Sequence, residues 1–228
     1  VINGLVNSDF EDLTVYTEVI QDGMFDLIDA GKLRVCSGTA LSPSPDCLKK
    51  FYDNVEKYKK YIILRPQEVA NSPEVARRIG VIAMNTAIEV DIYGNVNSTH
   101  ICGTKIMNGI GGSGDYARNG YLTVFFTTSL SKGGAISSVV PFCSHVDHTE
   151  HDVDVIVSER VVADLRGLSP EVRALVFIDK VANPKYQPLL LDYFKRACEA
   201  CGNSQTPHIM DEAFSFHDRF VKTGTMEK

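Results

Sequence analysis

The chain has 228 residues, of which 44% are hydrophobic, and a formal net charge of −6 from 23 basic and 29 acidic side chains. This length and composition predict a globular protein with a sizeable core, in one large or two small domains. The acidic balance argues against nucleic-acid binding, because a phosphate backbone is bound by a basic face. No apolar run reaches the roughly 18 residues of a membrane span, and no basic-then-apolar leader begins the chain. We therefore expect no nucleic-acid or membrane partner and a cytoplasmic protein, with a mitochondrion or related organelle as the alternative.

The first 84 residues alternate between segments typical of strands and of helices. Residues 15–17 predict a short strand that ends at Glu18, and apolar residues at helical spacing then extend from Gly23 to Ala30. Further strands are predicted at 33–36, 61–64 and 81–84, the second of them buried, and a further helix at 46–60. Asn71 or Ser72 can cap another helix that has Pro73 in its first turn.

From residue 86 the pattern becomes rich in strands that are separated by Gly, Asn or Ser turns. The predicted strands are 86–91, 100–107, 121–128, 135–140 and 153–157, and helices are predicted at 169–181 and 189–201, before a docked C-terminal tail. Strand–helix units around a β-rich middle predict an α/β fold with an open, mostly parallel sheet flanked by helices. Ligands of such sheets bind where strands end in loops.

Four glycines occur among the six residues from Gly109 to Gly114. This density lets a backbone approach a ligand closely and makes the segment a candidate anion or oxyanion site. The segment lacks the Gly-Lys-Ser/Thr ending of a Walker loop, and it breaks the G-x-G-x-x-G pattern of dinucleotide sites. A flexible surface loop between two strands is the alternative that composition leaves open.

Three histidines recur at three-residue intervals in the segment 144–152, namely His145, His148 and His151, and they alternate with Asp147, Glu150 and Asp152. Such a cluster can imitate a zinc site. A regular helix that aligns the imidazoles is disfavoured, because the segment follows Pro141 and precedes a predicted strand. We prefer a hydrogen-bonded structural or subunit-contact role and predict no metal site.

Five segments together resemble one known family. They are 16–18, 71–75, 94–99, 108–119 and 144–152. In this order they are similar to the C-terminal half of the acetyl-CoA hydrolase/transferase family, which includes succinyl-CoA:acetate and 4-hydroxybutyrate CoA-transferases. The resemblance extends from about residue 4 to about residue 200, and details in 16–18 and 111–115 look closer to the succinyl/acetyl branch. It implies a class I CoA-transferase-like α/β fold.

The resemblance also implies roles for five residues. Glu18 matches the family's nucleophile, which alternately carries an acyl group as a mixed anhydride and CoA as a glutamyl thioester. Gly112 matches a backbone oxyanion donor, and Asn71 matches an active-site asparagine that positions the glutamate or the carboxylate substrate. Asn108 and Lys132 match residues that contact CoA. Without the resemblance, Asn71 is a candidate helix cap and Lys132 an ordinary turn lysine.

We therefore predict an enzyme, a CoA-transferase that moves CoA between succinyl-CoA or acetyl-CoA and a small carboxylate such as acetate. CoA is expected as a substrate, without a tightly bound cofactor. An acetyl-CoA hydrolase and a non-catalytic CoA-binding or assembly module are the alternatives. Under this interpretation residues 1–228 are the C-terminal catalytic domain, and a CoA-binding loop lies in an absent upstream domain. The expected protein partners are that N-terminal half of the same enzyme and a second copy in a homodimer.

Overall fold

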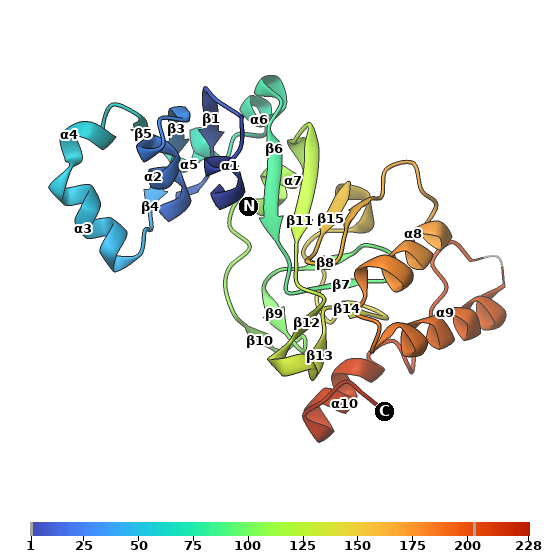
Figure 1. Ribbon diagram of the computed structural model, residues 1–228. Helices are drawn as coiled ribbons and strands as arrows, with labels where there is room; N and C mark the ends of the chain where they lie inside the picture. The colour runs from blue at the N-terminus through green and yellow to red at the C-terminus, as the bar shows by residue number, and fades with distance from the viewer. Residues whose placement is uncertain (1, 203) are drawn as a thin grey trace. The chain divides into compact units, whose positions relative to one another are not determined.

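The computed structural model describes residues 2–202 and 204–228 (Figure 1). By their internal contacts the residues separate into two compact units, Val1–Val81 and Ile82–Lys228. Each unit has its own hydrophobic core and is considered separately. No helix in the described part of the chain is long and apolar enough to cross a bilayer.

The first unit is built around a parallel sheet with the strand order β1-β3-β5. Its elements are α1 (Ile2–Val6), β1 (Leu13–Tyr16), β2 (Val19–Ile20), α2 (Asp22–Asp29), β3 (Leu33–Gly38), β4 (Ala40–Leu41), α3 (Pro45–Asp53), α4 (Val55–Tyr58), β5 (Ile62–Leu64), α5 (Gln67–Ala70) and α6 (Pro73–Ile79). The pair β2–β4 is also parallel and continues the register of β1–β3, since Tyr16 lies opposite Ser37 and Val19 lies opposite Ala40. Glu18 therefore lies between two strand pairs, just beyond the carboxyl end of β1.

The core of the first unit consists of apolar side chains from α2, β2, β3 and α4. Its buried members are Ile20, Phe25, Leu27, Ile28, Leu33, Cys36 and Tyr58. Phe25 packs edge-on against Phe51 and Tyr58, with ring centroids 5.9 and 5.1 Å apart. Aromatic pairs favour this edge-to-face geometry, so Phe25 fixes α2 against α3 and α4.

Two local predictions for the first unit are wrong. The strand predicted as buried at 61–64 corresponds to β5, an edge strand in which Ile63 and Leu64 are 41% and 55% exposed. An edge strand has a neighbour on one side only, and an apolar sequence does not reveal that position. The helix predicted at 46–60 is divided into α3 and α4, because Asn54 adopts a non-helical backbone with φ of −134°.

The second unit is organised around a sheet with the strand order β16-β15-β11-β6. Its elements are β6 (Ile82–Thr86), β7 (Glu89–Asp91), β8 (Val96–Asn97), β9 (His100–Ile101), β10 (Lys105–Ile106), α7 (Ser113–Asn119), β11 (Leu122–Phe126), β12 (Leu130–Ser131), η1 (Lys132–Gly134), β13 (Ile136–Ser137), β14 (Val139–Val140), η2 (Glu150–Asp152), β15 (Val155–Val157), β16 (Val162–Asp164), α8 (Pro170–Val176), η3 (Phe177–Val181), α9 (Gln187–Cys201) and α10 (Ser215–Thr223). Strands β6, β11 and β15 run parallel, and β16 is antiparallel at the edge.

The parallel pairings in both units confirm the predicted α/β class with mostly parallel sheets. The strands are divided among several small sheets, with β7 placed between β14 and β8 in another three-stranded sheet. The single strand predicted at 100–107 is a hairpin of β9 and β10. Its turn contains Cys102 and Gly103 with φ of 49° and 68°, and a Cβ on Gly103 would approach the Ser144 carbonyl oxygen to 2.8 Å.

The C-terminal segment of the second unit is docked, as predicted. Phe216 on α10 and Met226 are each only 2% exposed, and both belong to the core of this unit. The Met226 N–H donates to the Ala135 carbonyl oxygen at 2.8 Å. The tail thereby secures the segment between η1 and β13.

Replacement of Phe25 by alanine is expected to lower the free energy of unfolding of the first unit by about 3–5 kcal/mol, because it leaves a cavity among Phe51, Tyr58 and their neighbours. Urea unfolding, with hydrogen exchange of peptides from residues 20–60 as the local probe, measures this change. Phe10→Ala is the matched control, since Phe10 is 64% exposed. Equal effects of the two substitutions would contradict the assignment of Phe25 to the centre of the core.

Candidate functional site

Glu18 lies at the point where β1 ends and β2 begins. Its carbonyl oxygen accepts hydrogen bonds from the N–H groups of Thr39 at 2.8 Å and Ala40 at 3.2 Å, which fix the backbone against the end of β3 and the start of β4. The side chain is half-buried, and its Oε2 accepts a hydrogen bond from Nδ2 of Asn71 at 3.2 Å. The structure therefore brings together the two first-unit residues that the sequence predicts for the site.

Asn71 does not cap the following helix. That role belongs to Ser72, whose Oγ accepts the Val75 N–H at 3.4 Å, while Pro73 occupies the first turn of α6. Asn71 is 6% exposed, and its Oδ1 is buried without a hydrogen-bond partner among the described residues. Because Ser72 satisfies the helix end, the Asn71 amide is available to orient the Glu18 carboxylate.

Tyr16 holds the chain on both sides of Asn71. Its hydroxyl donates to the Val69 carbonyl oxygen and accepts the Ser72 N–H at 3.2 Å. Burial raises the pKa of Tyr16, so its phenol remains protonated and can donate at neutral pH. Tyr16 lies only two residues before Glu18. One strand therefore presents the carboxylate and also fixes the segment that carries its amide partner.

The glycine-rich segment of the second unit joins β10 to α7, and not two strands as in the surface-loop alternative. Asn108 is exposed, and its Nδ2 donates to the carbonyl oxygens of Ser98 and Gly109, each at 3.0 Å. Gly111 adopts a positive φ of 56°, which glycine tolerates without strain. Gly112 is buried and directly precedes Ser113, the first residue of α7.

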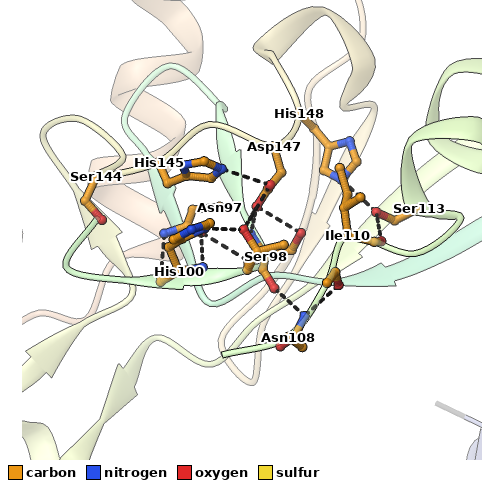
Figure 2. Close-up of polar contacts among 12 residues, drawn as sticks. Asn97, Ser98, His100, Asn108, Ile110, Ser113, Ser144, His145, Asp147 and His148 are labelled. Atoms are coloured by element: carbon orange, nitrogen blue, oxygen red, sulfur yellow. Dashed lines mark hydrogen bonds and ion pairs between the residues drawn. The ribbon is translucent and has the colours of Figure 1, made fainter. Parts of the chain in front are cut away.

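Asp147 fixes the start of the glycine-rich segment, at Asn108, through hydrogen bonds to residues 98 and 99 (Figure 2). Its carboxylate accepts the Ser98 N–H at 2.7 Å and the Thr99 hydroxyl at 2.9 Å. These bonds fix residues 98 and 99, whose carbonyl oxygens accept from Asn108 Nδ2 and from the Met107 N–H at 2.7 Å. The backbone around Asn108 is thus set by a carboxylate almost forty residues away in the sequence.

His148 controls the other end, at Ser113 (Figure 2). The Ser113 hydroxyl donates to the Ile110 carbonyl oxygen at 2.9 Å and lies 3.0 Å from Nε2 of His148. A hydroxyl has only one hydrogen, so His148 is assigned the tautomer in which Nε2–H donates to Ser113. Burial lowers the pKa of His148, which favours this neutral ring. Adjacent residues, Asp147 and His148, therefore fix both ends of the glycine-rich segment.

The three histidines have separate roles. His145 stacks against His100 with ring centroids 3.8 Å apart, and its Nε2 lies 3.3 Å from Oδ1 of Asp147. His151 is exposed and lies 3.4 Å from Glu150. Within residues 2–202 and 204–228, no group of three His, Cys, Asp or Glu side chains is arranged to hold a metal ion. His148 is hydrogen-bonded to Ser113, whereas His145 contacts the ring of His100 and the carboxylate of Asp147.

Lys132 lies on a different segment from Asn108 and Gly112, at the start of η1. It adopts a positive φ of 48°, and its Nζ lies 4.9 Å from the centroid of the Phe220 ring on α10. A cation over an aromatic face is attracted by the ring quadrupole. The predicted CoA contacts of Lys132 and Asn108, and the oxyanion role of Gly112, stay predictions.

Sequence reasoning missed the residues that support the site. Tyr16 and Asp147 both lie inside the motifs that carry the family resemblance, but each acts on backbone that is distant in the sequence. Burial and hydrogen bonding of these two side chains depend on the folded arrangement. The only sequence signal was their position within the motifs.

Comparison with known proteins finds similar sequences and a similar fold. Residues 48–194 match the family model described as the acetyl-CoA hydrolase/transferase C-terminal domain. The chain is 57% identical over 227 residues to a succinyl-CoA:acetate CoA-transferase of Clostridium kluyveri, covering 100% of this chain and 42% of that protein. It is 46% identical over 234 residues to an acetyl-CoA hydrolase of Candida albicans, covering 100% of this chain and 45% of that protein.

A solved structure of a RipA variant has the same fold, with a TM-score of 0.76 and 25% sequence identity. The match covers 86% of this chain and 46% of the RipA chain. The chain thus spans less than half the length of the relatives that it matches.

Tyr16→Phe is expected to loosen the segment around Asn71, because it removes the hydroxyl that bonds to Val69 and Ser72. The free energy of unfolding should fall by about 1 kcal/mol, and amide exchange in peptides from residues 66–80 should accelerate. Hydrogen–deuterium exchange with mass spectrometry measures the second effect. Tyr52→Phe is the control, since Tyr52 is 66% exposed. Unchanged exchange in the Tyr16 variant would show that its hydroxyl does not hold this segment.

Asp147→Asn tests the carboxylate that fixes the glycine-rich segment. Burial raises the pKa of Asp147, but the Ser98 N–H, the Thr99 hydroxyl and His145 outweigh it, so that the folded-state pKa is lowered. The ionised Asp147 carboxylate therefore stabilises the folded state fully above the unfolded-state pKa of about 3.9. This contribution to the free energy of unfolding is lost as pH falls through the lower folded-state pKa.

The difference in the free energy of unfolding between the wild type and the Asp147→Asn variant should accordingly be large at pH 5 and decrease towards pH 3. Urea unfolding at several pH values measures it, with the exposed Asp211→Asn as the control. A difference that does not change over this range would contradict the role of the ionised carboxylate.

Proposed function

Because the chain belongs to the acetyl-CoA hydrolase/transferase family, we propose that the protein containing it moves CoA between an acyl-CoA and a small carboxylate, with Glu18 as the nucleophile. Succinyl-CoA or acetyl-CoA are the proposed donors and acetate the proposed acceptor. The substrates named for the Clostridium relative support this choice.

The observation that carries the proposal is the hydrogen bond from Asn71 Nδ2 to Glu18 Oε2. It orients a carboxylate at the carboxyl end of a parallel strand, which is where ligands of such sheets bind. A carboxylate that is already oriented loses less entropy when it attacks a bound substrate. Asn71 is buried and Tyr16 fixes its backbone, so the orientation is built into the fold.

In the proposed reaction, the Glu18 carboxylate attacks the thioester carbonyl and expels the CoA thiolate, which gives a mixed anhydride. The thiolate then attacks the glutamyl carbonyl, releasing the first carboxylate and leaving CoA as a thioester on Glu18. An incoming carboxylate attacks this thioester to form a second anhydride. The thiolate then attacks the acyl carbonyl, which releases the new acyl-CoA and restores Glu18. No step changes an oxidation state, which fits CoA as substrate without a tightly bound cofactor.

Each attack on a carbonyl creates an oxyanion that a backbone N–H can stabilise. We propose the Gly112 N–H as this donor and Asn108 and Lys132 as CoA contacts, on the strength of the family resemblance. Asp147 and His148 support the roles proposed for Gly112 and Asn108, because they fix both ends of the segment that contains these two residues.

Hydrolysis of acetyl-CoA is the second candidate, and the name of the Candida relative favours it. In that reaction water, in place of the acceptor carboxylate, attacks the covalent intermediate on Glu18. Exclusion of water during the anhydride stage would decide between the two outcomes. We also propose that activity requires an N-terminal half of the same enzyme and that the enzyme is a homodimer.

Glu18→Ala in the complete enzyme is expected to reduce CoA exchange by at least about 10³-fold, because no other group replaces the nucleophile. In the wild type, succinyl-CoA followed by borohydride should reduce the glutamyl thioester to an alcohol at residue 18. Mass spectrometry of the peptide identifies that product. Glu68→Ala is the matched control, since Glu68 is an exposed glutamate of the same unit.

Product analysis with and without acetate separates transfer from hydrolysis. Transfer predicts acetyl-CoA as the product with acetate present, and almost no turnover without an acceptor. Unmodified Glu18 in an enzyme that still consumes succinyl-CoA would overturn the covalent mechanism.

A further inference from the structure

We propose that Arg65 binds the second carboxylate of a dicarboxylic acyl group, and that this contact favours succinyl-type substrates over uncharged acyl groups. The inference deepens the proposed function and rests on it. It assigns substrate preference to a residue of the first unit that lies outside the five residues assigned by the family resemblance.

Arg65 directly follows β5, at the carboxyl end of the parallel sheet. Its N–H donates to the Gly38 carbonyl oxygen at 2.8 Å, and its Nε donates to Oγ of Ser37 at 3.0 Å. Ser37 lies on β3, so the Arg65 side chain extends from the edge strand across its neighbour. Ser37 is in turn the register partner of Tyr16 on β1. Register partners in a sheet present their side chains on the same face.

Tyr16 connects this face to the reacting carboxylate. Its hydroxyl bonds to Val69 and Ser72, which lie on either side of Asn71, and Asn71 donates to Glu18. Burial raises the pKa of Tyr16, and the charge of Arg65 opposes that shift, so the guanidinium acts on the phenol electrostatically. Arg65 thus contacts Ser37 on the face that carries Tyr16, and Tyr16 fixes the segment that carries Asn71, the hydrogen-bond donor to Glu18.

The Arg65 guanidinium has more hydrogen-bond donors than its contact with Ser37 uses. An arginine carries five N–H donors, and Ser37 uses only the one on Nε. Throughout residues 2–202 and 204–228, its terminal NH groups have no hydrogen-bond or ion-pair partner. A planar pair of such groups matches a carboxylate in two parallel hydrogen bonds. The anchored Nε–H reduces the freedom that the side chain loses when it binds.

Two buried polar atoms near Glu18 also lack a partner among the described residues. They are Oγ1 of Thr39, whose backbone N–H bonds to the Glu18 carbonyl, and Oδ1 of Asn71. Buried polar atoms are nearly always hydrogen-bonded, so these two indicate a region completed by a polar ligand. A dicarboxylic acyl group on Glu18 supplies carbonyl and carboxylate oxygens that can accept a hydrogen bond from the Thr39 hydroxyl, whereas the Asn71 amide oxygen is itself an acceptor and is satisfied only by a donor.

The test compares three acyl donors in the complete enzyme: succinyl-CoA, butyryl-CoA, which has the same number of acyl carbons without the second carboxylate, and acetyl-CoA. Arg65→Gln is expected to lower kcat/KM for succinyl-CoA by about 10- to 100-fold, the range of a lost charge-assisted hydrogen bond. Values for butyryl-CoA and acetyl-CoA should change by less than about threefold. Arg65→Lys should retain more succinyl-CoA activity than Arg65→Gln, since lysine keeps the positive charge but lacks the planar guanidinium that binds a carboxylate through two hydrogen bonds.

Arg34→Gln is the matched control, because Arg34 lies near the opposite end of β3 and bonds to Thr14. An equal loss with all three donors would overturn the inference, since it would assign Arg65 to CoA binding or to stability. No loss with succinyl-CoA would overturn it as well. Failure of the proposed function is a distinct result, because it is seen in the wild type as the absence of a trapped Glu18.

Discussion

The hydrogen bond between Asn71 and Glu18 is the contact on which the candidate site of the first unit depends. It joins residues 53 positions apart, and it requires two separate features of the fold. The parallel register of β1, β3 and β5 brings the carboxyl ends of the strands to one edge, where Glu18 and Arg65 both emerge. Ser72 satisfies the start of α6, so the Asn71 side chain is not used as a cap. Tyr16 links these features by bonding to the backbone on both sides of Asn71.

The second unit fixes its glycine-rich segment by a different means. Glycines supply the backbone freedom that the turn needs, but freedom alone does not define one conformation. Asp147 and His148 restrict it from outside, by hydrogen bonds that reach Ser98 and Ser113. Their carboxylate and imidazole are largely buried, and buried hydrogen-bond networks that are well satisfied make a region rigid. The histidine-rich motif thus fixes the glycine-rich segment through its hydrogen bonds to backbone and hydroxyl groups.

Much of the local structure was predictable from the chain. The strand before Glu18, the helix that begins at Pro73 and the strand–helix order all follow from apolar spacing and cap residues. Errors occurred where long-range context prevails over local pattern. An apolar run at 61–64 became an exposed edge strand, and a positive φ at Cys102 turned one predicted strand into a hairpin. The pairing of Glu18 with Asn71 was anticipated from a family resemblance, because no local rule connects the two segments.

The sequence by itself determined the α/β class, the family and the candidate nucleophile, because periodicity, turn residues and the order of motifs are properties of the chain as written. Only the tertiary structure decided which groups meet. It assigned the cap to Ser72 and the amide of Asn71 to Glu18, gave the histidines separate partners, and placed Arg65 against Ser37. These outcomes depend on strand register and burial, which bring distant residues within hydrogen-bond distance and which no local stretch of sequence specifies.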